Sequence, residues 1–175
     1  MKNIKSLLTI LSFVFVFSLA VSAQSLTALD GGKVDVQNQD GKVVVLAIGA
    51  SWLPLSTQQA TITNKLAKKY AGRDVVVYFV ATDSSSAKSK NYASDEELNS
   101  FAARNKLNVP ILRDSDGAQT FKKYGIDQLP SFVILGKDGK PATEAFGGIG
   151  SIDPKNTNPK DDISVPISQA IDRIL

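Results

Sequence analysis

The sequence predicts an α/β fold in which helices cover both faces of a mixed central sheet, a three-layer α/β/α sandwich. Residues 43–48 and 74–81 are continuous apolar runs of strand length, which is typical of strands buried on both faces. Between them, residues 57–70 place apolar and basic side chains on opposite sides of a helix. Such a β-α-β unit has parallel strands, whereas a hairpin expected within residues 131–146 adds antiparallel strands, so the sheet is mixed.

Local signals predict the elements before and after this unit. Residues 26–36 form a short extended lead-in with a glycine pair at its turn, and residues 82–92 are polar and predict a loop. Ser94 and Glu97 then have the spacing of a capping box, which marks the start of a helix. The elements expected further along are a strand, a short helix closed by glycine and the hairpin, at residues 109–112, 118–124 and 131–146.

The C-terminal part is predicted to be a linker followed by a docked helix. Residues 151–164 are polar and contain two prolines, so they predict a linker. Residues 165–175 carry one apolar helical face, and we expect this helix to pack on the domain. The members of this face are Ile167, Ala170, Ile171 and Ile174.

The N-terminus has the features of a secretory signal peptide. Lys2 and Lys5 precede a mostly apolar run, and small residues follow at the positions that a signal peptidase reads. We therefore expect a signal peptide at residues 1–23, a domain at residues 24–150 and a secreted or periplasmic protein. An uncleaved membrane anchor is the alternative, but the run is short for a span, which needs about 20 residues. No cysteine follows the run, which excludes a lipoprotein anchor.

Composition excludes several function classes. The chain of 175 residues contains no cysteine and no histidine, so thiol chemistry, Cys/His zinc sites and histidine-based catalytic triads are excluded. Removing Lys2 and Lys5 takes the formal charge from +3 to +1, and such a domain does not resemble a nucleic-acid binder. A modest basic cluster is interpreted as a solvated helix face; it comprises Lys65, Lys68, Lys69 and Arg73.

Several motifs, in the right order, resemble a known family. Residues 42–54 resemble the strand and active-site turn of TlpA- and ResA-like thioredoxin-fold proteins, thiol-disulfide oxidoreductases of the redoxin (AhpC-TSA) type. Residues 108–112 resemble a later strand of these proteins, and residues 124–132 resemble their cis-proline loop. The resemblance implies a thioredoxin-like fold over residues 26–146, with Pro130 in the cis form.

The family's chemistry requires two cysteines that this chain lacks. In these proteins a Cys-x-x-Cys pair lies at a helix N-terminus, where the helix dipole favours the thiolate of the first cysteine. By resemblance the pair falls on Leu53 and Ser56. Leucine offers no nucleophile, and no histidine is present to activate the serine. We therefore expect no catalytic residue and no cofactor.

Ser56 also has a structural interpretation. Ser56 and Gln59 have the spacing of a capping box, in which the serine hydroxyl accepts from the N–H of Gln59 while the glutamine reaches back. Such a cap contributes on the order of 1 kcal/mol. We favour this interpretation over Ser56 as a nucleophile.

The resemblance also implies a peptide-binding surface. In the family, the backbone just before the cis-proline pairs with an extended peptide, and Leu129 holds that position here. An apolar groove is predicted, and the expected binding residues are Trp52, Leu53, Pro54, Leu129 and Pro130, with Leu55 beside them. The alternative is that Trp52 and Leu55 simply pack against the neighbouring loop.

Oxygen-bearing side chains raise the question of calcium. They cluster near the C-terminus at Asp153, Asn156, Asn158, Asp161 and Asp162. Their order does not match an EF-hand loop, and the prolines favour a solvated linker, so no metal is expected. Asp114 and Asp116 are interpreted as turn residues in the same way.

Three functions follow from this sequence. The preferred one is an exported, redox-inactive domain that binds peptides or unfolded proteins, in a chaperone-like manner. The alternative is the family's own role, thiol-disulfide exchange or a peroxiredoxin-like antioxidant role in redox homeostasis, with cysteines supplied by a partner. The third is a structural domain that binds another envelope protein.

Overall fold

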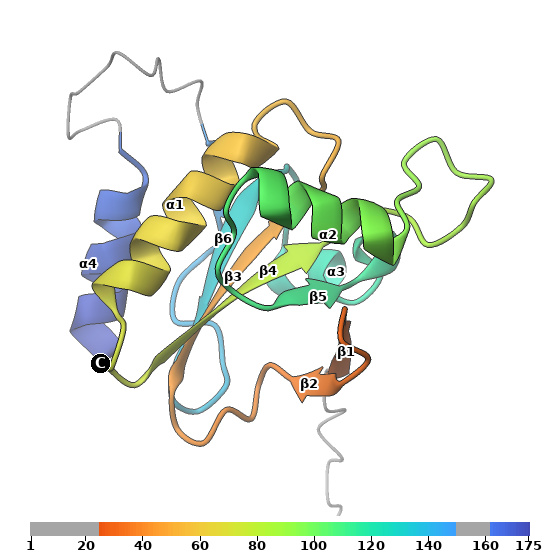
Figure 1. Ribbon diagram of the computed structural model, residues 1–175. Helices are drawn as coiled ribbons and strands as arrows, with labels where there is room; N and C mark the ends of the chain where they lie inside the picture. The colour runs from red at the N-terminus through yellow and green to blue at the C-terminus, as the bar shows by residue number, and fades with distance from the viewer. Residues whose placement is uncertain (1–24, 150–161) are drawn as a thin grey trace, which may run out of the picture.

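The computed structural model describes residues 25–149 and 162–175, and these form a mixed sheet with helices on both faces (Figure 1). The strands lie in the order β2-β1-β5-β4-β3-β6-β7. Their bounds are β1 Ser25–Ala28, β2 Lys33–Asp35, β3 Val43–Gly49, β4 Val75–Ala81, β5 Ile111–Arg113, β6 Ser131–Leu135 and β7 Phe146–Gly147. The helices are α1 Ser56–Lys69, α2 Asp95–Arg104, α3 Thr120–Tyr124 and α4 Ser164–Ile174, with a 3-10 turn at Ser115–Gly117. The predicted signal peptide and most of the predicted linker lie outside the described residues.

The central β-α-β unit is confirmed. β3 pairs in parallel with β4, and β4 pairs in parallel with β5, while β6 runs antiparallel to β3. All seven residues of β3 and all five of β6 are buried, because helices cover both faces of these strands. The mixed three-layer fold that the sequence predicts is therefore the fold observed.

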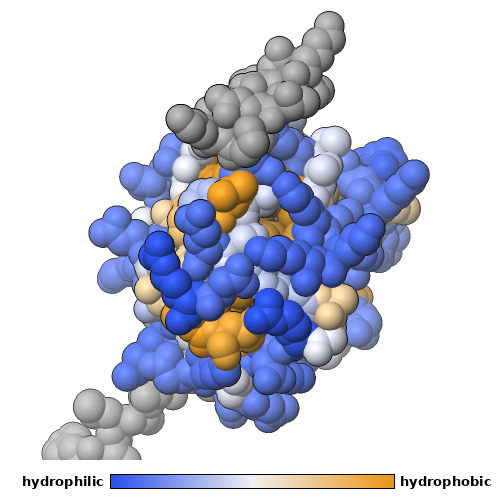
Figure 2. Space-filling model, turned by 90° about the vertical axis from the view of Figure 1, so that its left-hand side faces the viewer, coloured by the Kyte–Doolittle hydropathy of each residue, from blue (hydrophilic) through white to orange (hydrophobic). Residues whose placement is uncertain are grey.

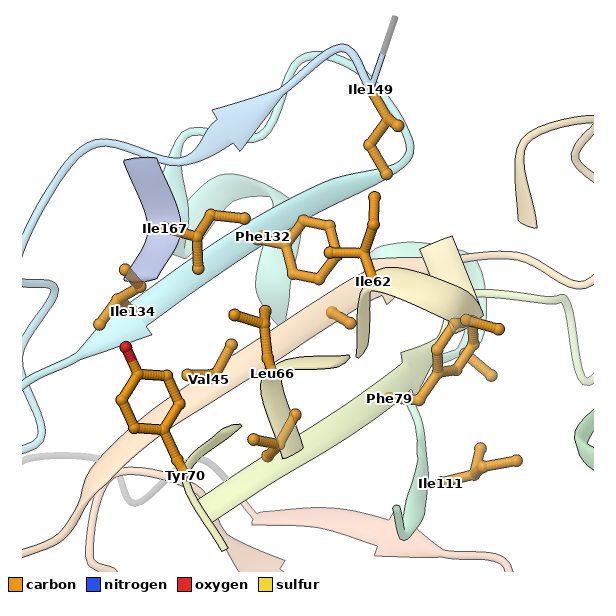
Figure 3. Close-up of a cluster of buried hydrophobic side chains, with 14 of the residues drawn as sticks. Val45, Ile62, Leu66, Tyr70, Phe79, Ile111, Phe132, Ile134, Ile149 and Ile167 are labelled. Carbon is orange, nitrogen blue, oxygen red and sulfur yellow. The ribbon is translucent and has the colours of Figure 1, made fainter. Parts of the chain in front are cut away.

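Two apolar clusters lie on opposite faces of the sheet. On one face, side chains of α1, α2 and α4 pack against alternate strand residues, and Figure 3 shows Ile62, Leu66 and Ile167 facing Phe132 and Ile134. The other face is covered by α3 and by the segment that leads into β6. Alternation along each strand sends successive side chains into the two clusters, so the sheet is the centre of the fold.

The C-terminal helix is joined to α1 by polar contacts as well as by apolar packing. Ile167, Ala170 and Ile171 are buried in the larger cluster. The Tyr70 hydroxyl donates to the backbone oxygen of Ser168 at 3.0 Å and is 2.9 Å from an Asp172 carboxylate oxygen. The apolar face that the sequence shows in this segment is therefore the face that packs.

Three predicted element bounds were wrong, and a proline explains two of them. The strand expected at residues 109–112 begins later, at Ile111, because Pro110 has no N–H to contribute to the ladder. The strand expected to continue to Phe146 is reduced to β7, and Pro141 makes only an isolated bridge to Leu135. The helix expected at residues 118–124 begins at Thr120, where the buried Asp114 carboxylate accepts the backbone N–H groups of Gln119 and Thr120.

Candidate functional site

The predicted site residues lie at one edge of the sheet. The segment that contains Trp52 follows the end of β3, and the Leu129–Pro130 loop leads into the start of β6. Because Ser131 pairs with Ile48 across the two antiparallel strands, these segments begin side by side. The peptide bond between Leu129 and Pro130 is cis.

The predicted binding residues differ in exposure. Trp52 is 52% exposed, the highest value for a large hydrophobic side chain in the described part of the chain. Pro54 is also exposed, Leu53 and Leu55 are half-buried, and Leu129 is half-buried against the cluster on the α3 side. Pro130 is buried. The neighbouring loop therefore leaves about half of the Trp52 side chain accessible.

Two consecutive turns lead from β3 into α1. The N–H of Leu53 donates to the backbone oxygen of Ala50 at 3.2 Å, and the N–H of Ser56 donates to that of Leu53 at 3.0 Å. Leu53 therefore precedes the helix, and Ser56 is its first residue. Neither position carries a group that can form a thiolate or a disulfide.

The capping box predicted at Ser56 is wrong. The N-cap residue of α1 is Leu55, and no side chain caps this helix. The Ser56 hydroxyl instead donates to the backbone oxygen of Ser51 at 3.2 Å, and Gln59 is fully buried. Gln59 does not reach back to the start of the helix, because its side chain is held in the core by bonds to two strands.

Gln59 joins the two halves of the site. Its side-chain N–H group donates to the backbone oxygen of Ile48 at 3.0 Å and to that of Ser131 at 3.3 Å. A Cβ at Gly49 would lie 2.1 Å from the Gln59 Oε1 atom, so only glycine gives this side chain room. Within residues 25–149 and 162–175, Oε1 has no hydrogen-bond partner. One side chain of α1 therefore links the end of β3 to the start of β6.

Asp83 fixes the other side of the same segment. Its buried carboxylate accepts from the backbone N–H of Ser51 at 3.0 and 3.1 Å and from the Ser51 hydroxyl at 2.6 Å. The Thr82 hydroxyl donates to the backbone oxygen of Gly49 at 3.1 Å. These bonds fix the backbone at Gly49 and Ser51, just before Trp52.

Gln59 and Asp83 were not predicted as site residues, although the sequence carries a signal for both. Gln59 lies three positions before Ile62 and seven before Leu66, which places it on the buried face of the helix. Asp83 follows β4, and the carboxyl ends of parallel strands share one edge of a sheet. Helical phase and strand direction were therefore enough to bring both residues to the site.

The hydroxyl groups here have structural partners. The Ser51 hydroxyl donates to a carboxylate that also accepts the backbone N–H of the same residue, so Asp83 positions a turn. The Ser56 hydroxyl donates to a carbonyl oxygen, which cannot take up its proton. A serine nucleophile needs an adjacent general base, and this arrangement provides positioning only.

A polar cavity of about 440 Å³ adjoins the Leu129–Pro130 loop. Gln128 and Ser131, which flank the loop, form part of its wall. The other lining residues are Tyr124, Gly125, Asp127, Glu144, Ala145 and Gly147. Burial raises the pKa of Tyr124 to about 12, with the carboxylates of Asp35 and Asp114 adding to the shift, so this phenol stays protonated at neutral pH.

The basic cluster on α1 is largely neutralised by the C-terminal region. Lys65 pairs with Asp162 at 2.5 Å, while Lys69 and Arg73 pair with Asp172 at 3.1 and 3.6 Å. Figure 2 shows the side of the molecule on which α4 lies, and its surface is mostly hydrophilic, with small separate hydrophobic patches. These contacts are those of a solvated helix face.

The predicted oxygen-rich cluster falls mainly outside the described residues, which include only Asp162 of its members. Across the part of the chain that the structure describes, no three Asp, Glu, Cys or His side chains come together in a group that could hold a metal ion. Of the helices described, none has both the length and the apolarity to span a bilayer.

Comparison with known proteins finds one family model and several relatives that match most of the chain. A family model described as "AhpC/TSA family" matches residues 19–141. "Thiol-disulfide oxidoreductase ResA" of Bacillus thuringiensis is 26% identical over 121 residues, 69% of this chain and 64% of ResA. "Thioredoxin-like protein YneN" of Bacillus subtilis is 32% identical over 115 residues, 66% of this chain and 62% of YneN. The chain thus aligns with less than two thirds of the length of either relative.

A solved structure agrees on the fold. A thioredoxin-like protein from Aeropyrum pernix superposes with a TM-score of 0.65 at 19% identity, covering 87% of this chain and 89% of that one. At this identity the likeness supports the thioredoxin-like fold alone. The fold is thioredoxin-like, and Leu53 and Ser56 stand at the two positions where the resemblance places cysteines.

Proposed function

The chain belongs to the AhpC/TSA family, and from this premise we propose that it is an exported, redox-inactive module that binds extended peptides or unfolded protein segments. The observation that carries the proposal is Trp52, half-exposed beside a turn that Asp83 and Gln59 hold in place. An exposed aromatic side chain on a fixed turn is suited to contact a partner, since little conformational freedom is lost on binding. The binding surface consists of Trp52, Leu53, Pro54, Leu129 and Pro130.

Redox inactivity rests on chemistry. Disulfide exchange proceeds by attack of a thiolate on a disulfide sulfur, and the chain holds no cysteine. The names of its relatives nevertheless favour the family role as a second candidate, in which a partner supplies both cysteines. A peroxiredoxin-like antioxidant role would likewise require a partner protein to supply the peroxidatic cysteine. The third candidate is binding to one envelope protein, which co-purification from the source cells would detect.

Intrinsic fluorescence tests the peptide-binding proposal directly, because Trp52 is the only tryptophan in the chain. A library of extended peptides is titrated into the purified protein, and binding is expected to change the Trp52 emission. Leu129→Asp is expected to weaken binding about ten-fold or more, because it puts a charge on the apolar surface.

Tyr92→Ala is the matched control, since Tyr92 is another exposed large hydrophobic residue, at 41%, in a different loop. It is expected to leave binding unchanged. Equal binding by the wild type and Leu129→Asp would contradict the proposed surface. Export is tested separately by intact-mass analysis of the protein that the source cells produce, with a chain starting near Gln24 as the expected result.

A further inference from the structure

The polar cavity beside the Leu129–Pro130 loop is the feature that the proposed function does not use. It measures about 440 Å³, within the range of roughly 300–1,000 Å³ found for small-ligand sites. Gln128 and Ser131, the residues on either side of the loop, contribute to its wall, so the cavity adjoins the point at which the proposed function places a peptide. The cavity and the proposed binding surface are therefore neighbours.

The charge of the cavity has one sign. Asp127 and Glu144 line it from two different segments, and none of its lining residues is a lysine or an arginine. In the described part of the chain neither carboxylate makes an ion pair. The nearby Lys123 ammonium group donates to the side-chain oxygen of Gln37, so that cation has another partner. The cavity thus offers two unpaired carboxylates to a cationic ligand.

The backbone shapes the cavity for close approach. Gly147 lines it in β7, and a Cβ at that position would lie 2.6 Å from the Gln128 side-chain nitrogen. Gly148 follows with a φ of +64°, a conformation that favours glycine. A side chain at Gly147 would clash with Gln128, which also lines the cavity. Glycine at this position therefore lets β7 and the Gln128 side chain approach each other closely.

We infer that this cavity binds the guanidinium group of an arginine side chain in the peptide held at the Leu129–Pro130 loop. That the arginine belongs to a bound peptide rests on the proposed function. That the cavity binds a guanidinium group rests only on the residues that line it. A planar guanidinium presents five N–H donors in a fork and can reach acceptors on two segments, which an ammonium point charge does less well. Within the described residues these two carboxylates belong to no group of three or more Asp, Glu, Cys or His side chains that could hold a metal ion.

The first experiment probes the cavity without a peptide. Nα-acetyl-arginine amide is titrated into the isotope-labelled protein and the backbone amide signals of Gln128 and Gly147 are followed, with the uncharged isostere Nα-acetyl-citrulline amide as the reference probe. The arginine probe is expected to shift these signals, and the citrulline probe to leave them in place. Equal shifts from both probes, or none from either, would overturn the inference.

Charge-neutralising variants locate the site. Asp127→Asn and Glu144→Gln are each expected to weaken binding of the arginine probe by about two- to five-fold, since both carboxylates are exposed and partly screened. Asp74→Asn is the matched control, because it removes the same charge from an exposed position at the opposite end of the parallel strands. It is expected to leave binding unchanged. If Asp74→Asn weakened binding of the arginine probe as much as Glu144→Gln, the effect would come from the net charge of the protein, and the proposed site would be contradicted.

Paired peptides then separate this inference from the proposed function. Peptides that bind the Trp52 surface are compared with arginine or citrulline at the same position, and a two- to five-fold preference for arginine is expected. If peptides bind but the arginine probe does not, the cavity inference fails and the proposed function stands. If the probe binds and no peptide does, the cavity inference holds and the proposed function fails.

Discussion

At the start of two helices in this protein a serine is followed three residues later by glutamine or glutamate, and only one of these pairs forms a capping box. At α2 the Ser94 hydroxyl accepts from the N–H of Glu97 at 3.2 Å, and the Glu97 carboxylate accepts from the N–H of Ser94 at 2.7 Å. At α1 the equivalent glutamine is buried and bonds to two strands instead. The difference is one of burial: the Glu97 side chain is exposed, whereas Gln59 lies on the face that meets the sheet.

A capping pattern therefore predicts a cap only where the glutamine or glutamate three residues after the serine is not buried in the core. At α1 the lost cap is replaced by a link between β3 and β6, and those are the strands that carry the two halves of the candidate site. At the place where the family carries its cysteines, the polar side chains of this protein instead fix the backbone by hydrogen bonds.

The largest effect is expected from Gln59→Ala. Removal of this side chain takes a donor from two backbone oxygens and opens a void beside Gly49, at an expected cost of about 3 kcal/mol in the free energy of unfolding. Glu97→Ala, the matched change at α2, is expected to cost about 1 kcal/mol, because its partner reaches water. Urea unfolding of both variants measures the contrast. Equal losses would show that Gln59 does no more than an ordinary cap.

Gly49→Ala tests the same link from the strand. The new methyl group would lie 2.1 Å from the Gln59 Oε1 atom, so we expect a loss of about 2 kcal/mol from overpacking. In a Gln59→Ala background the clash is removed, and Gly49→Ala is expected to cost well under half as much. A double-mutant cycle built on urea unfolding gives the coupling. Additive losses would contradict the contact.

Substitution of the two serines, Ser94 and Ser56, is expected to have different effects on stability. Ser94→Ala removes a true N-cap and is expected to cost about 1 kcal/mol. Ser56→Ala loses a single 3.2 Å bond, and alanine is the better helix former, so its expected cost is about 0.5 kcal/mol or less. Thermal unfolding of the pair checks the order, and a reversal of the order would restore the capping interpretation for Ser56.

Acid should weaken the start of α2 and spare the start of α1. The first turn of α2 carries Asp95, Glu96 and Glu97, whereas the first turn of α1 has no acidic residue. The pKa of Glu96 is lowered, chiefly by a hydrogen bond from its own backbone and then by one with the Ser94 side chain. A lowered carboxyl pKa contributes stability above the unfolded value of 4.5, and this is lost as the pH falls through the folded pKa.

The measurement is the Cα chemical shift of the first turn of each helix between pH 6 and pH 3. Loss of helical shift is expected at residues 95–98 below about pH 4.5, and no change is expected at residues 56–59. Parallel fraying of both helices would show that the acid effect is global rather than local to the carboxylates.

Much of the fold was predictable, because buried strands and amphipathic helices leave periodic signals. The runs at residues 43–48 and 74–81 became parallel strands, and the capping box at Ser94 was confirmed. The prediction of a strand up to Phe146 was wrong. Pro141 has no N–H for a neighbouring strand, and strand propensity alone does not show whether a neighbour requires one at that position.

The site was predictable only in part. The degenerate positions Leu53 and Ser56 were found from the motif, but distant segments supply the groups that bond to their neighbours Ser51 and Gln59. Asp83 and Ser131 meet this segment only through the pairing of β3 with β4 and β6. A local pattern cannot register such contacts, although the predicted parallel pairing already places Asp83 at the right edge.

The central claim is that this site binds without sulfur chemistry, and disulfide turnover tests it most directly. Reduction of insulin by dithiothreitol is followed with the wild-type protein, with the variant Leu53→Cys/Ser56→Cys and with no protein. The wild type is expected to match the reaction without protein, while the double variant, which restores the pair at the start of α1, is expected to exceed it. Turnover by the purified wild-type chain above the reaction without protein would contradict the account.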